Sequence, residues 1–134
     1  MLGDMIGELT GKTVGQRIPR GYGGDLKLER TIQVEGKLLG TKVTFIATSW
    51  SKERPNGGMY TKGHGMMMTE SGERAILKGS GISIPSKGQG MSIRGARYLQ
   101  TSGKELSRLN NVALLFEIEI APDGMVTDRM WEWK

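Results

Sequence analysis

Apolar and polar residues alternate along most of this chain, in short stretches separated by turn residues. From residue 26 to residue 34 every second position is apolar except for Arg30, and the positions between carry Lys, Glu, Thr and Gln. The segment 112–120 alternates in the same way, with Glu117 and Glu119 opposite a face of apolar residues. Successive side chains of a β-strand point to opposite faces of a sheet, so this period of two predicts strands with one buried and one wet face.

Eight such stretches follow one another at nearly even spacing. Turn residues separate them, among them Glu-Gly-Lys at 35–37, Pro-Asn-Gly-Gly at 55–58 and Pro-Asp-Gly at 122–124. Short connections between consecutive strands indicate an up-and-down meander, and eight strands is a number at which such a sheet closes. We predict an all-β chain with one domain over residues 1–134, a single eight-stranded antiparallel up-and-down barrel whose first strand pairs with its last. The expected strands are residues 5–14, 26–34, a third that ends at residue 50, 59–69, 74–84, 90–100, 112–121 and 126–133.

One segment breaks the alternation, between the sixth and seventh expected strands. Ser102 and Glu105 have the spacing of a capping box, and Leu106 and Leu109 follow at helical spacing. We predict one short helix over residues 103–109 that plugs one end of the barrel. An irregular connection is the alternative.

The composition excludes several kinds of site. The chain has no cysteine and one histidine, which excludes thiolate sites, multi-histidine metal sites and a cysteine nucleophile. Neither a phosphate-binding loop nor a serine-nucleophile elbow is present. We therefore expect no metal and no cofactor. The lack of cysteine also favours a reducing cytoplasm, and without a signal sequence or a long apolar run we expect no membrane partner.

The formal net charge is +5, but acidic and basic residues are interspersed along the sequence. A protein that binds single-stranded nucleic acid needs exposed aromatic side chains beside basic ones, and aromatic residues make up only 6% of this chain. We therefore expect no nucleic-acid partner. Assembly with further copies of the chain stays open.

A candidate site follows from the expected pairing of the middle strands. This pairing places His64, Gly79 and Gly95 in one row on the more apolar face, with Arg97 one step along. Glycines that face inward leave space, and a histidine and an arginine beside that space are typical of a small pocket with few polar groups. Tyr60 shares the face of His64.

That register depends on the partners chosen across two turns, Thr69 opposite Arg74 and Ile84 opposite Gly90. It also places Met66 and Met68 on the inner face. A bulge or a slip by one residue would exchange the two faces of a strand.

Two further arginines lie on apolar faces of the expected strands. Arg30 interrupts the apolar face of the second strand, and Arg129 shares a face with Trp131 and Trp133. Unpaired buried charge is very costly, and the expected inner faces offer few carboxylates. An anionic, partly hydrophobic small molecule would supply the partner. The candidate ligand-binding residues are His64, Arg97, Tyr60, Gly79, Gly95, Arg30 and Arg129.

Each of these features also has a plainer explanation. Inward glycines let strands coil sharply at barrel corners. A single histidine in a strand can be a hydrogen-bonded core residue, and arginines at a barrel end can keep their charged heads in water. Trp131 and Trp133 are expected to pack against Phe116 and Leu114.

The chain as a whole resembles a group of small, uncharacterised prokaryotic proteins. The resembling stretches are residues 59–65 (Met-Tyr-Thr-Lys-Gly-His-Gly), 106–110 (Leu-Ser-Arg-Leu-Asn) and 131–134 (Trp-Glu-Trp-Lys), and none of them has an assigned chemistry. In architecture the chain is similar to allene-oxide-cyclase-type and lipocalin-type barrels. That resemblance implies binding or cyclisation of small hydrophobic molecules, and it carries over no residue.

Three functions remain open at this point. The first is a small-molecule-binding barrel, the second is a cyclase- or isomerase-like enzyme that uses His64 and Arg97 in the same cavity, and the third is a structural or interaction module with a filled core. A cavity of roughly 300 Å³ or more would favour the first two. Both also require His64 to point inward. In both, Gly79→Leu should fill the space without breaking the sheet.

Overall fold

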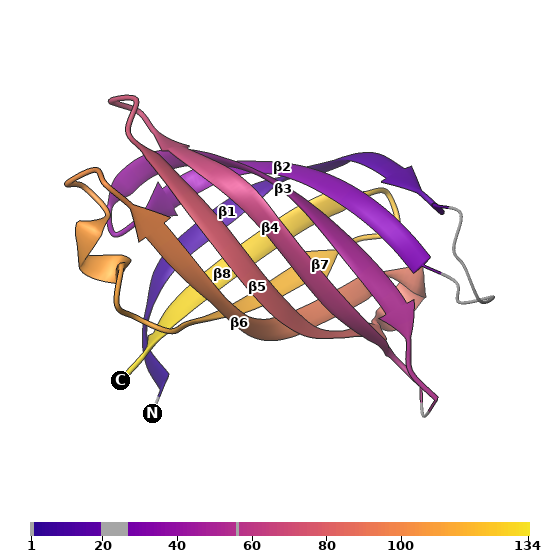
Figure 1. Cartoon of the computed structure of the whole chain (residues 1–134). Coiled ribbons are helices and arrows are strands. Elements are labelled where there is room, and N and C mark those ends of the chain that lie inside the picture. Colours follow the sequence, from indigo (N-terminus) through magenta and orange to yellow (C-terminus); the bar gives the residue numbers. More distant parts are fainter. Residues whose placement is uncertain (1, 20–26, 56) are drawn as a thin grey trace.

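The structure, a computed structural model, describes residues 2–19, 27–55 and 57–134. Eight antiparallel strands follow one another around a closed barrel, and β1 pairs with β8 to complete it (Figure 1). The predicted eight-stranded up-and-down barrel is therefore confirmed. Its strands are β1 Leu2–Arg17, β2 Lys27–Leu38, β3 Thr41–Glu53, β4 Met59–Thr69, β5 Arg74–Pro85, β6 Met91–Thr101, β7 Leu114–Ile120 and β8 Met125–Trp133.

The predicted alternation places one face of every strand in the barrel interior. In β7 the residues Leu114, Phe116, Ile118 and Ile120 are buried, and the positions between them are partly exposed. The same alternation places Ile32, Val34 and Leu38 of β2 in the core. Side chains of all eight strands contribute to this core, which also includes residues of the connection between β6 and β7.

That connection closes one end of the barrel, at the left of Figure 1. Leu106 and Leu109 are both buried in the core, so the predicted plug is present. It is not the helix expected over residues 103–109, because its only helical element is a single 3₁₀ turn, η2, at Ser107–Leu109. A second short 3₁₀ element, η1, lies at Lys87–Gln89 between β5 and β6.

The expected capping box at Ser102 and Glu105 does not form, because both glutamates near the plug bond elsewhere. The Glu73 carboxylate, from the turn between β4 and β5, accepts backbone N–H groups of Lys104 and Glu105. Glu105 in turn accepts hydrogen bonds from the hydroxyls of Thr69, at 2.9 Å, and of Ser71. The plug is thus held by the neighbouring hairpin instead of by its own cap.

Strand bounds differ from the expected ones mainly in β1 and β2. Residues 35–37, expected as a turn, continue β2, where Gly36 pairs with Val43. The turn lies at Leu39 and Gly40, both with positive φ, 52° and 76°. A two-residue turn with positive φ at both positions matches the twist of a β-hairpin. The hairpin therefore turns at residues 39 and 40, and β2 continues past residue 34 up to that turn. Among the described residues, no helix is long and apolar enough to cross a membrane.

Candidate functional site

One cross-strand row of inward positions runs through the middle of the barrel. It begins with Arg30 on β2, passes Ser49, Gly63 and Gly79 on the next three strands, and reaches Arg97 on β6. An arginine therefore lies at each end of this row, and small residues occupy the three positions between them. Arg30, Gly79 and Arg97, three of the residues predicted from the sequence, lie together here, and Gly95 lies in the adjacent row opposite Gly81.

His64 and Tyr60 do not belong to this row, because the register of β4 differs from the expected one. Met68, not Thr69, pairs with Arg74. The turn contains three residues and ends at Gly72, whose φ is 96°, and the Thr69 N–H donates to the Glu73 carbonyl. Three-residue hairpin loops commonly end in such a left-handed glycine.

The shift by one residue exchanges the two faces of β4. Tyr60, Met66 and Met68 are 47%, 43% and 38% exposed, and His64 is exposed as well. Met67, Gly65 and Gly63 take the inward positions. The prediction that the His64 side chain points into the cavity is wrong, because that side chain is exposed on the outer face. The binding and the cyclase hypotheses both relied on an inward His64, so any site in the lumen has to be built from other residues.

Arg129 is also on the outer face. Its Nε donates to Glu8 at 2.8 Å, on the neighbouring strand β1. The inward positions of β8 are those of Val126, Asp128, Met130 and Glu132, all buried. Glu132 lies at the plugged end, where it pairs with Arg108 at 2.7 Å. Trp133 is 60% exposed, so the expected packing of the two terminal tryptophans against Leu114 and Phe116 is wrong too.

Asp128 supplies the carboxylate that the sequence reading missed. Arg97 Nη1 lies 2.9 Å from Asp128 Oδ2 and 3.1 Å from Oδ1, and both side chains are almost completely buried. The guanidinium also lies over the ring of Phe116, 4.2 Å from its centroid, and near that of Phe45 at 5.6 Å. Burial raises the pKa of Asp128, and the charge and hydrogen bonds of Arg97 oppose that rise. Arg97 points inward as predicted, but its charge is already paired.

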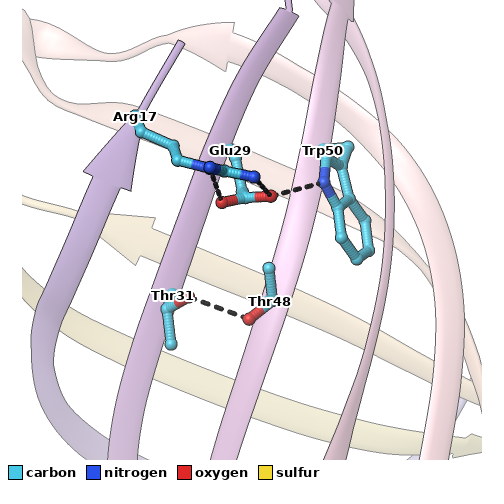
Figure 2. Close-up of polar contacts among 5 residues, drawn as sticks. All are labelled: Arg17, Glu29, Thr31, Thr48 and Trp50. Atoms are coloured by element: carbon cyan, nitrogen blue, oxygen red, sulfur yellow. Dashed lines mark hydrogen bonds and ion pairs between the residues drawn. The ribbon is translucent and has the colours of Figure 1, made fainter. Parts of the chain in front are cut away.

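Arg30 has a different environment. Its Nη1 lies 3.5 Å from the Met91 sulfur, and its buried Nε has no hydrogen-bond partner among the described residues. Partial burial lowers its pKa. The adjacent carboxylate in sequence, Glu29, lies on the outer face, where it bonds Arg17 at 2.5 Å and the Trp50 indole N–H at 2.9 Å (Figure 2). Arg30 is thus a cation in the lumen that lacks a carboxylate partner within the described part of the chain.

The inward glycines have close backbone neighbours instead of open space. A Cβ at Gly79 would lie 2.7 Å from both the Ala96 carbonyl oxygen and the Arg97 Cβ. At Gly95 it would lie 2.0 Å from the Ser80 carbonyl oxygen. The plainer explanation of these glycines is correct: they let β5 and β6 approach closely where the barrel coils. Gly79→Leu cannot fill a void there without moving the backbone.

A cavity of about 70 Å³ remains inside the barrel. It is mostly apolar, with Arg30 and Arg97 among its lining residues, and it is smaller than the roughly 300 Å³ of a typical small-molecule site. Beside it, at the end of the barrel away from the plug, lies a more open hollow of about 380 Å³. We call this the mouth hollow; its lining residues are Glu53, Arg54, Gly57, Gly58, Met59, Ser83, Ile84, Pro85 and Met91.

A chain of buried hydroxyls connects the cavity with the mouth hollow. The Thr61 hydroxyl lies 2.8 Å from that of Ser51 and 2.5 Å from that of Ser83. Thr61 lines the cavity and Ser83 lines the mouth hollow, as does Met91, the contact of Arg30. The sequence held a signal for these residues: Ser51 has the same strand parity as Val43 and Phe45, so it belongs to the buried face.

No family model and no curated protein matches the sequence. Solved structures do resemble the fold. A conserved protein of unknown function from Rhodopseudomonas palustris has a TM-score of 0.80 at 15% identity, over 99% of each chain. A β-barrel-like protein from Acinetobacter baumannii has a TM-score of 0.77 at 11% identity, over 99% of this chain and 96% of that one.

A third similar structure is described as an enzyme from Penicillium herquei, with a TM-score of 0.64 at 14% identity, over 98% of this chain and 96% of that one. At these identities the likeness shows the barrel fold alone. Within the described residues there is no group of three or more His, Cys, Asp and Glu side chains that could hold a metal ion.

Proposed function

We propose that this protein is a small-ligand-binding barrel whose ligand carries an anionic group that pairs with Arg30. The observation that carries the proposal is the unequal state of the two lumen arginines. Arg97 is neutralised by Asp128 at 2.9 Å, whereas Arg30 has a buried Nε without a hydrogen-bond partner among the described residues. A half-buried guanidinium in an apolar lining attracts a carboxylate or phosphate oxygen, because that bond relieves its desolvation.

The size of the site limits the ligand. A cavity of about 70 Å³ accepts only a short apolar group next to Arg30, so the rest of a longer molecule would extend into the mouth hollow. The hydroxyls of Thr61 and Ser83 offer hydrogen bonds along that path. A short-chain carboxylate fits both the charge and the volume.

The likeness to lipocalin-type and allene-oxide-cyclase-type barrels supports a binding role by fold analogy, and the barrel plugged at one end agrees with it. We place this role in the cytoplasm, on the ground that the chain has no cysteine. The similar Penicillium herquei structure is described as an enzyme. Because the His64 side chain lies on the outer face, we propose binding and not catalysis for the described residues of the lumen.

A structural or interaction module with a filled core is the second candidate. The observation in its favour is the cavity volume, well below that of a typical ligand site. In that case Arg30 would stay hydrated from the mouth, with its stem packed on the apolar lining.

Native mass spectrometry distinguishes the two. Protein purified under non-denaturing conditions should carry a small copurified anion, or gain thermal stability with a carboxylate from a series running from acetate to hexanoate. Arg30→Met should abolish both effects, and Arg17→Met, an arginine of the outer face, should leave them unchanged. If neither a bound mass nor a carboxylate-dependent shift of Tm is found for the unchanged protein, the filled-core module is correct.

A further inference from the structure

The outer surface of β3, β4, β5 and β6 carries basic side chains and no carboxylate. Its outward positions are the even-numbered ones in all four strands, as the exposure pattern and the register show. Every one of these strands is fully described, and Asp or Glu occurs at none of these outward positions. The cations of this surface, which we call the basic face, are Lys42, Lys52, Lys62, Arg74, Lys78 and Arg94.

The acidic side chains at outward positions lie on the other strands of the barrel, two of which, β2 and β7, border the basic face. At that border Glu117 of β7 lies 3.8 Å from Arg94. Outward positions of β7, β1 and β2 hold Glu117, Glu119, Glu8, Glu29 and Glu35. The carboxylates that are interspersed with cations in the sequence are therefore confined to one half of the barrel. That half carries both signs, with Lys12, Lys37 and Arg129 beside the glutamates, whereas the outward positions of β3 to β6 carry cations alone. This removes one of the two grounds on which a nucleic-acid partner was excluded.

Aromatic rings stand among the cations of the basic face. Tyr60 and Tyr98 are 47% and 58% exposed. His64 is exposed and shares a cross-strand row with Lys78 and Tyr98. The overall aromatic content is low, but Tyr60, Tyr98 and the His64 ring lie among the cations of the basic face, where a single-strand binder needs them.

Trp50 adds a ring with a fixed orientation. It pairs with Lys62 in the register, and its ring meets that of His64 edge to face at 5.2 Å between centroids. Its indole N–H is held by Glu29 on β2 (Figure 2). A ring already held in place loses little conformational freedom when a base stacks on it.

We infer that the basic face binds single-stranded nucleic acid. Phosphates would contact Lys62, Lys78 and their neighbours, and bases would stack on Tyr60, Tyr98 and His64. Rings beside cations on a sheet surface are how sequence-tolerant single-strand binders work. An anionic lipid surface would use the same charges but has no need of aromatic rings between them, so the rings favour a nucleic acid.

The test measures the fluorescence anisotropy of a labelled single-stranded oligothymidine with the whole protein, over a series of salt concentrations. Binding should weaken as salt rises. Lys62→Gln combined with Lys78→Gln should weaken binding about tenfold and reduce the salt slope by about 1.4, since each lost phosphate contact removes about 0.7. The matched control is Lys12→Gln combined with Lys37→Gln, the same charge change on β1 and β2, which should leave the affinity within about twofold.

A second pair of variants tests the stacking. Tyr98→Leu should weaken binding, and Tyr98→Phe, which keeps the ring, should restore it. Circular dichroism of each variant shows whether the barrel is intact.

Three results would overturn the inference. They are no binding of the oligothymidine by the unchanged protein, an equal loss of affinity in both lysine pairs, and binding of phosphatidylserine vesicles without binding of the oligonucleotide.

Discussion

Arg97 and Asp128 form an ion pair of 2.9 Å inside the barrel, from strands that β7 separates. The carboxylate is completely buried, and the guanidinium lies over the ring of Phe116. Such a pair adds less to stability than its geometry suggests, because two charges must leave water to form it. Its main effect is mutual: each charge lowers the free-energy cost of burying the other in the core.

Removal of one partner should therefore cost far more than removal of both. We expect Asp128→Ala to lower the free energy of unfolding by about 3–5 kcal/mol, since it leaves a buried cation unpaired. Arg97→Met combined with Asp128→Leu should lie much nearer to the unchanged protein. Urea denaturation of the single and double variants measures both. A double variant as unstable as the single one would mean that the pair is net stabilising.

Gly79→Ala tests the close approach of β5 and β6. The added methyl group would meet the backbone of Ala96 and the Cβ of Arg97 at 2.7 Å, so we expect a loss of about 1–3 kcal/mol. Gly15→Ala is the control, because its Cβ would meet nothing closer than 3.9 Å. Thermal denaturation should show a lower Tm for the first variant only. Equal Tm values would show that β5 and β6 can separate without cost.

Glu105 should make the attachment of the plug depend on pH. Hydrogen bonds from Ser71 and Thr69 to its carboxylate lower its pKa in the folded protein. A lowered carboxyl pKa means a contribution that is complete at neutral pH and is lost as the pH falls through the folded pKa. The difference in stability between the unchanged protein and Glu105→Gln should thus be largest near pH 7 and vanish in acid. Denaturation at a series of pH values checks this, and a pH-independent difference would contradict it.

Ser102→Ala should have almost no effect. The sequence assigned this side chain to a helix cap worth about 1 kcal/mol. In the structure the neighbouring backbone N–H groups bond to Glu73 instead, so we expect a change within about 0.5 kcal/mol. Glu73→Ala should be clearly more destabilising in the same urea experiment. If Ser102→Ala proved the more destabilising of the two substitutions, the helix-cap role of Ser102 would be supported instead.

The fold was predictable because alternation is a local property. The bounds of β4, residues 59–69, were predicted correctly, and β5 and β6 were displaced by at most one residue at their ends. Register is not local. The sequence allows either a three-residue loop, 70–72, or a four-residue loop that also includes Glu73. The structure has the shorter loop, and that difference alone places His64 on the outer face.

The lumen was only partly predictable for the same reason. Arg30 and Arg97 interrupt apolar faces and were found by that signal. Asp128 interrupts the face of Val126 and Met130 in the same way, but Trp131 and Trp133 drew attention to the opposite face of β8. These two large aromatic residues made the outer face of β8 look more apolar than the inner one, and alternation alone does not show which face is buried.

The plug at Leu106 and Leu109 closes one end of the barrel. If the proposed binding role holds, a ligand would enter and leave at the other end, where the mouth hollow lies. A substitution there that narrows the passage without contacting the bound ligand should slow loading and release by the same factor. The rate of exchange would then change while the occupancy at equilibrium stays the same.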